Sequence, residues 1–241
     1  HYYGNIHSQR GQDGILAQIF RVLNVDNGIF IEFGAWDGVY LSNTRWLYEK
    51  GWAGVYIEGS HKRYQELVSN YAKSSVKCIN SYVNTNENCV SNLLIEHGIN
   101  GESIDFMSID IDGYDLEVFE ASNVKPKVVL LEGGFAFSPN IEVDVAEDWM
   151  VEGIQHPIDT INKRIERMGY KAVCFYQDLY LVRDDLANKF IRYEIKDLYK
   201  HGYYFMPKFL KEGLLKFRGG NKLIKLHETR VRGFFNKDPL I

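Results

Sequence analysis

The sequence predicts an α/β fold whose doubly wound, mostly parallel sheet is covered by helices on both faces. Short apolar runs of strand length alternate with amphipathic segments of helical period along most of the chain. The runs are apolar throughout instead of at every second residue, which is typical of parallel strands buried on both faces. The 241 residues, 45% of them hydrophobic, are enough for one large core and an appendage.

The predicted elements follow one another in alternation. A helix over 12–23 places its apolar residues on one stripe, with Ser8 as its candidate cap, and a continuous apolar strand follows at 29–33. Further strands are predicted at 55–57, 76–83, 106–111 and 128–131. The helices between them are predicted at 41–50, 61–71, 91–97 and 114–121.

The C-terminal third closes the sheet and then changes in character. Pro157 opens a helix that Gly169 ends, and two apolar runs at 171–175 and 179–182 predict a hairpin. The connection 140–155 is long and acidic, as loops that act as lids or substrate walls often are. From Lys200 onward ten Lys and Arg residues oppose three Asp and Glu. We therefore divide the chain into a domain at 1–189 and a basic, partly helical extension at 190–241, through which the protein could form a homo-oligomer.

The composition limits which binding partners and which cellular compartment are expected for the protein. Cys78, Cys89 and Cys174 have no metal-type spacing and indicate buried thiols in a reducing compartment. No apolar run approaches the roughly 20 residues that a membrane helix needs. We expect a cytoplasmic protein, although the start at His1 leaves open an N-terminal signal that has been removed. No stacking motif or zinc knuckle predicts nucleic-acid binding.

The turn after the first strand, FGAWDG, predicts a nucleoside-binding site. Ligands of doubly wound sheets bind at the carboxyl ends of the strands, and Glu58 ends the second strand, where it could bind both hydroxyls of a ribose. This pattern suits NAD as well as S-adenosylmethionine. A dinucleotide fingerprint needs glycine where this chain has Trp36, whose indole would obstruct a pyrophosphate. Trp36 therefore favours S-adenosylmethionine, whose sulfonium Glu32 and Asp37 could stabilise.

Several stretches together resemble the FkbM-type S-adenosylmethionine-dependent methyltransferases, many of which modify sugar hydroxyls. They are HSQRGQDGILAQIF, IFIEFGAWDGVYLSNTRWLYEKGWAGVYIEG, DFMSIDIDGYDLEVFEA, VVLLEGG and MGYKAVCFYQDLYLVRDDL. The resemblance covers about residues 8–186 and implies a Rossmann-like fold of the class I methyltransferase type. Tyr114 and the stretch GIQHPID depart from the family pattern, and both flank the expected acceptor site.

The resemblance also implies which residues bind the donor. The methionine portion is expected against the turn and the residues around it, the ribose on Glu58, and the adenine beside residues 81–83. Gln9 and Gln12, on the helix before the first strand, are expected to reach the carboxylate of the methionine portion. The full set of implied cofactor contacts is Gln9, Gln12, Glu32, Gly34, Ala35, Trp36, Asp37, Gly38, Glu58, Ser81, Tyr82 and Asp110.

Methyl transfer to a sugar hydroxyl needs a base or a metal ion, because the hydroxyl is a poor nucleophile. Asp110, Asp112 and Glu132 end neighbouring strands and could hold a divalent ion such as Mg²⁺, or one of them could be the base. Asp110 and Asp112 could instead cap the next helix. His156 is a second candidate base, since the positive end of the following helix would favour its neutral form, and a helix-capping role is the alternative.

The sequence thus predicts an O-methyltransferase that acts on a sugar of a nucleotide-sugar or a surface polysaccharide. Two other functional hypotheses stay open. One is an NAD-dependent oxidoreductase of nucleotide sugars, and the other is a protein that binds S-adenosylmethionine without catalysis.

Overall fold

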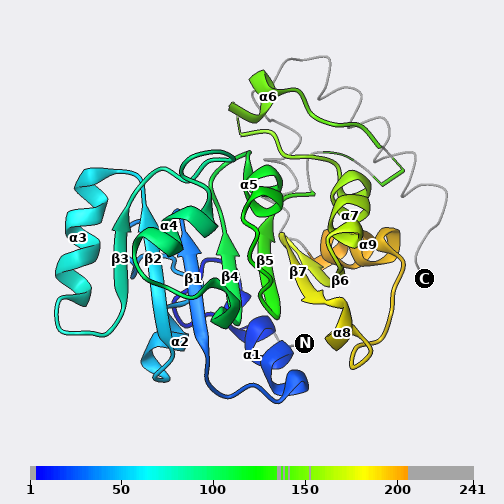
Figure 1. Ribbon diagram of the computed structural model, residues 1–241. Coiled ribbons are helices and arrows are strands. Elements are labelled where there is room, and N and C mark those ends of the chain that lie inside the picture. Colours follow the sequence, from blue (N-terminus) through cyan, green and yellow to red (C-terminus); the bar gives the residue numbers. More distant parts are fainter. Residues whose placement is uncertain (1–3, 135–136, 138, 141, 152, 206–241) are drawn as a thin grey trace.

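The computed structural model describes residues 4–134, 137, 139–140, 142–151 and 153–205 (Figure 1). Its centre is a seven-stranded sheet in the order β3-β2-β1-β4-β5-β7-β6. The first five strands in this order are parallel, and β7 runs antiparallel to both of its neighbours. The predicted doubly wound, mostly parallel sheet is confirmed, and an antiparallel hairpin of β6 and β7 closes it. The strands are β1 Ile29–Phe33, β2 Ala53–Glu58, β3 Lys77–Asn80, β4 Phe106–Ile109, β5 Val128–Glu132, β6 Tyr170–Tyr176 and β7 Asp178–Arg183.

Helices cover both faces of the sheet (Figure 1). One hydrophobic cluster joins the sheet to α1, α2 and α3, and the other joins it to α4, α5, α7 and α9. Each strand contributes to both clusters because successive side chains point to opposite faces. The helical segments are α1 Gln12–Leu23, α2 Arg45–Glu49, α3 His61–Tyr71, α4 Val90–Glu96, the 3₁₀ turn η1 Gly101–Ser103, α5 Asp115–Ala121, α6 Glu147–Val151, α7 Ile158–Arg167, α8 Asp184–Ala187 and α9 Ile195–Phe205.

Two predictions at the ends of helices are corrected. The second helix begins at Arg45 and not at residue 41, because residues 42–44 are held on the Glu32 carboxylate and the Ser42 hydroxyl accepts the backbone N–H groups of Thr44 and Arg45. Ser8 does not occupy the capping position of α1, which is Gly11. Its hydroxyl nevertheless accepts the backbone N–H of Asp13 at 3.1 Å, so it satisfies one of the unpaired donors of the first turn.

The chain after the hairpin continues into the body of the protein. Tyr199 of α9 stacks on Phe175 of β6 with ring centroids 5.5 Å apart. At Gly202 an added Cβ would lie 2.4 Å from the Phe175 carbonyl oxygen, so the helix backbone lies directly on the strand. The domain boundary at residue 189 stays a prediction, and the basic segment from residue 206 lies outside the described residues.

The helices and the cysteines of the described residues bear on whether the protein has a membrane span or a disulfide bond. No helix in the described residues is both long and apolar enough to cross a bilayer. Cys78, Cys89 and Cys174 are free thiols, of which Cys89 is buried. The cytoplasmic location stays a prediction.

Candidate active site

A row of carboxylates follows one edge of the sheet on the face covered by α1, α2 and α3. Register brings its members together, because Glu132 pairs with Asp178 and Glu32 pairs with the residue two positions before Asp110. β7 is antiparallel, so its first residue lies at the same edge as the last residues of the parallel strands. In spatial order the row is Glu58, Glu32, Asp110, Glu132 and Asp178.

The glycine turn after β1 is tight on its inner side and open on its outer side. Gly34 has φ +74°, and an added Cβ would lie 2.1 Å from the carbonyl oxygen of Asp110. Gly38 has φ +72°, and a Cβ there would meet Tyr71. Trp36 also takes a positive φ of 53°, but the residue is 44% exposed. The bulk of the indole therefore projects away from the turn, which only the two glycines need to keep small.

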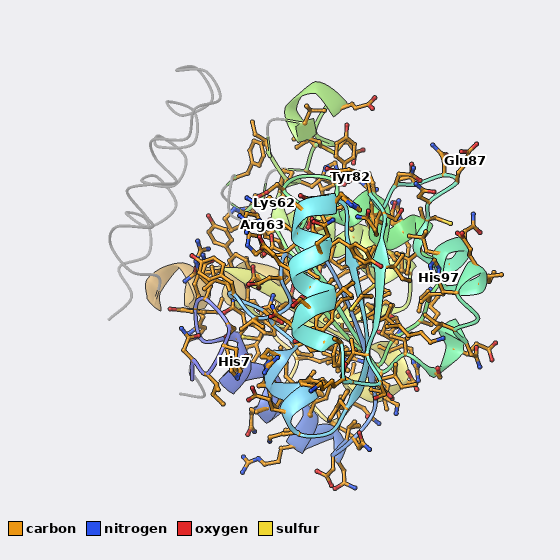
Figure 2. The ribbon with its side chains drawn as sticks, turned by 90° about the vertical axis from the view of Figure 1, so that its left-hand side faces the viewer. His7, Lys62, Arg63, Tyr82, Glu87 and His97 are labelled. Atoms are coloured by element: carbon orange, nitrogen blue, oxygen red, sulfur yellow. The ribbon has the colours of Figure 1, made fainter. Side chains whose placement is uncertain are left out.

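The Trp36 side chain has a cationic neighbour. The Arg63 guanidinium lies 3.9 Å from the centroid of the indole ring, a favourable cation-π contact. Figure 2 shows Arg63 and Tyr82 at the same end of α3. Tyr82 is 73% exposed and lies over Gly59, where a Cβ would come within 2.3 Å of its ring. These residues surround the end of β2, and the expected adenine position beside Ser81 and Tyr82 stays a prediction.

Glu58 is almost buried and its carboxylate is already oriented. One oxygen accepts the backbone N–H of Trp36 and the other that of Ser60, each at 2.7 Å. A carboxylate has about four acceptor sites, so two remain for the hydroxyls of a ribose. Asp37 is used differently, because its Oδ1 accepts the backbone N–H groups of Val39 and Tyr40 and so stabilises the turn.

Glu32 holds the segment that leads into α2. Its Oε1 accepts the backbone N–H of Asn43 at 2.9 Å, and its Oε2 accepts the hydroxyls of Ser42 and Thr44. Burial raises the pKa of the Glu32 carboxyl, and these hydrogen bonds oppose that rise. The predicted contact of Glu32 with the methionine portion is left with one acceptor site, on Oε1.

Asn43 is a site residue that the sequence did not indicate. It is buried, and its side-chain amide donates to the Ser108 hydroxyl at 3.1 Å. Its Oδ1 is buried without a donor among the described residues. Buried carbonyl oxygens of this kind are rare in proteins and are often satisfied by a ligand or a water molecule. Only the fold could show that Asn43 is buried at this edge of the sheet, since nothing in the stretch LSNT distinguishes this asparagine from a surface residue.

Asp110, Asp112 and Glu132 are brought together as predicted. Each offers an oxygen atom, and the three oxygens lie within 4.8 Å of one another. Surrounding protein reduces the hydration of Asp110, and the charge of Asp112 adds repulsion, so the pKa of Asp110 is raised. Burial, followed by the charge of Asp110, raises the pKa of Glu132 well above its ordinary value. The cluster therefore favours either a shared proton or a bound cation.

The loop that carries Asp112 is held by a carboxylate from the next helix. Buried Asp115 accepts the backbone N–H groups of Ile111 and Gly113 at 3.0 and 2.9 Å. Burial raises the pKa of Asp115 to about 7. Asp112 itself takes a positive φ of 57°, and no side chain caps the start of α5. The capping alternative for Asp110 and Asp112 is therefore not what the structure shows.

Asp178 extends the cluster and was missed at the sequence level. Gln12 donates its side-chain N–H to Asp178 at 2.9 Å and accepts the backbone N–H of Arg10. Burial and the charge of Asp110 raise the pKa of Asp178 to about 7, and the charge of Arg10 opposes this rise. Gln12 thus lies on the acidic cluster. Gln9 is exposed and lies in the segment before α1, not on the helix where it was expected.

His156 lies in the segment between α6 and α7, and among the described residues its ring makes no hydrogen bond to the acidic cluster. Its neighbour Gln155 donates to Glu132 at 2.6 Å, but the imidazole itself is only 2% exposed. Its Nδ1 accepts the backbone N–H of Val145 at 3.0 Å, and its Nε2 lies 2.8 Å from Glu117. These contacts require the neutral ring with the proton on Nε2. Both nitrogens are engaged, so in this arrangement His156 has no lone pair for a substrate proton.

A sequence match indicates the class of protein to which this chain is similar. Residues 79–172 match the family described as the methyltransferase FkbM domain. This part of the chain therefore matches a methyltransferase FkbM domain, as the resemblance implied.

Solved structures with a similar arrangement are distant in sequence. A putative caffeoyl-CoA O-methyltransferase from Staphylococcus aureus is 16% identical, with a TM-score of 0.47 over 75% of this chain and 86% of that one. A putative O-methyltransferase from Klebsiella pneumoniae is 14% identical, with a TM-score of 0.48 over 75% and 83%. An O-methyltransferase from Bacillus cereus in complex with SAH is 19% identical, with a TM-score of 0.46 over 74% and 84%. No curated protein matches the chain.

Proposed function

We propose that the protein transfers the methyl group of S-adenosylmethionine to a hydroxyl of a sugar, either linked to a nucleotide or part of a surface polysaccharide. One observation carries the proposal. The turn at Gly34 touches the backbone of Asp110, the first residue of the acidic cluster. A methyl donor on the turn and a hydroxyl on the cluster would therefore be neighbours.

The donor half of the site consists of residues 34–38, Glu58 and Asn43. Glu58 keeps acceptor sites for the ribose hydroxyls, and the unsatisfied Oδ1 of Asn43 suits the amino group of the methionine portion. The open outer side of the turn leaves room for a ligand beside Trp36. Ser81 and Tyr82 border the adenine in this proposal.

The acceptor half consists of Asp110, Asp112 and Glu132. A base works best when its pKa lies near the operating pH, and the crowding raises the pKa values of Asp110 and Glu132 in that direction. One of these carboxylates takes the hydroxyl proton as the oxygen attacks the methyl carbon in line with the sulfonium. The remaining carboxylates accept hydrogen bonds from neighbouring hydroxyls and so orient the sugar.

The acceptor half also fits a divalent cation. Three carboxylate oxygens within 4.8 Å are the hard ligands that Mg²⁺ prefers. When bound, such an ion would acidify the sugar hydroxyl and offset the repulsion within the cluster.

The test is methyl transfer to a panel of nucleotide sugars that includes UDP-glucose, GDP-mannose and dTDP-rhamnose. The protein is incubated with S-adenosylmethionine with and without Mg²⁺, and products are detected by the mass of one added methylene. A methylated sugar supports the proposal, and Mg²⁺ dependence supports the cation site. Binding of S-adenosylhomocysteine with no methylated product from nucleotide sugars or isolated polysaccharide contradicts the sugar assignment.

A further inference from the structure

The connection between β5 and α7 contains a segment that is fastened along α7. We call residues 142–151, which include α6, the strap; α6 and α7 are drawn in Figure 1. The backbone N–H of Val143 donates to the Thr160 hydroxyl at 3.1 Å, and that hydroxyl donates back to the Val143 carbonyl at 3.0 Å. Glu142 forms an ion pair with Lys163. His156, Thr160 and Lys163 are four and three residues apart, so they lie on one side of this part of the chain and contact residues 142–145 of the strap.

The far end of the strap lies on the loop of the acidic cluster. An added Cβ at Gly113 would be 2.1 Å from the carbonyl oxygen of Met150, so the two backbones are in direct contact. Val145, Met150 and Ile154 form a small hydrophobic cluster against which Tyr114 packs. The strap therefore covers the loop that contains Asp112, which the acceptor half needs in place.

His156 joins the strap to the body of the domain. Its unprotonated Nδ1 accepts the backbone N–H of Val145, and its Nε2–H points to Glu117 of α5. Arg164 binds the same Glu117 oxygen at 2.8 Å, and it also pairs with Glu120. A nearly buried imidazole with fixed donors and acceptors is suited to orientation and not to proton exchange with a substrate.

We infer that His156 is a positioning residue that clasps the strap through Nδ1 and so holds it against the loop of Asp112. The consequence for the acceptor, a fixed wall beside the reacting hydroxyl, rests on the proposed function. The clasp itself does not, because it is defined by contacts within this chain. The two ring nitrogens of buried His156 thus connect the strap to α5, one as acceptor and one as donor.

Two substitutions separate the roles of the two ring nitrogens. His156→Asn places an amide oxygen close to the Nδ1 position and keeps an acceptor for Val145, whereas His156→Gln keeps a donor at the Nε2 position and loses that acceptor. Hydrogen exchange of the full chain is followed by mass spectrometry in peptides spanning 142–151 and 110–116. We expect exchange in both peptides to be roughly two- to tenfold faster in His156→Gln and close to wild type in His156→Asn.

Equal exchange in the two variants overturns the inference, whether both match wild type or both are faster. Thr160→Val offers a second route if the histidine variants do not fold, because it removes both hydrogen bonds to Val143 with little change in shape. Unchanged exchange in 142–151 of that variant also overturns the inference. Binding of S-adenosylhomocysteine, measured by calorimetry on the same samples, should be unchanged. If wild type does not bind it, the proposed function fails while the exchange result still decides the clasp.

Discussion

The carboxylates of the donor half and of the acceptor half have different hydrogen-bond surroundings. In the donor half, both oxygens of Glu58 accept backbone N–H groups. In the acceptor half, Asp110 and Glu132 lie close to each other and to Asp112, Glu132 has one donor, the Gln155 amide, and the pKa values of both carboxyls are raised. The Glu58 carboxylate is therefore already oriented by the backbone, whereas the acceptor half holds repulsion between carboxylates that a proton or a cation would relieve.

The largest effect that would sharpen this contrast is expected from Glu132→Gln. It removes one charge of the crowded cluster while keeping an oxygen for Gln155. We expect methyl transfer to a sugar found with the panel to fall by about a hundredfold or more. Stability should be unchanged or slightly higher, and affinity for S-adenosylhomocysteine unchanged. Initial rates measure methyl transfer, calorimetry measures the affinity for S-adenosylhomocysteine, and urea unfolding measures stability. Exposed Glu96→Gln is the control. Retained turnover would remove Glu132 from the catalytic cluster.

The contact between the two halves is tested by Gly34→Ala. The new methyl group would press on the Asp110 carbonyl at a positive φ, and we expect a loss of about 2–4 kcal/mol in the free energy of unfolding. Affinity for S-adenosylhomocysteine should fall at least about tenfold. The matched control is Gly51→Ala, which has φ +90° but no atom within 4 Å of its Cβ. It should show only backbone strain of about 1–2 kcal/mol and normal binding. Equal effects of the two variants would contradict a role for the contact.

A smaller effect is expected in the pH dependence of stability. Asp178 has a folded pKa raised to about 7 from an ordinary 3.8, so the stability linked to its protonation is present at low pH and lost as pH rises through 7. One such group makes the protein about 1.4 kcal/mol less stable at pH 8 than at pH 6. Asp178→Asn should lessen this slope when unfolding is followed in metal-free buffer. A slope equal to that of wild type would show that Asp178 is ionised throughout.

Much of the fold could be predicted from the sequence because its signals are local. The periodic runs of α1, α3 and β1 gave the bounds that the structure has. The start of α2 could not be found, since it depends on a buried carboxylate from another strand. α6 lies in a stretch that the sequence described only as an acidic connection.

The sequence predicted those residues of the candidate site whose positions follow from the ends of parallel strands alone. Asp110, Asp112 and Glu132 follow parallel strands, so their meeting could be expected. Asp178 begins a strand, and its place at the same edge depends on the antiparallel direction of β7. The burial of His156 depends on Val145 and Glu117, which are distant in the sequence and meet it only in the folded chain.

The central claim is that the donor half binds S-adenosylmethionine, and thermal unfolding tests it most directly. S-adenosylhomocysteine or NAD is added at about a hundredfold over its dissociation constant, each with and without Mg²⁺. Binding to the folded state at that excess stabilises it by about 2.7 kcal/mol, which raises the midpoint of a chain of this size by roughly 5–10 °C. We predict this shift with S-adenosylhomocysteine and none with NAD, with a further rise when Mg²⁺ is present. A shift with NAD alone would contradict the interpretation of Trp36 and the donor site with it.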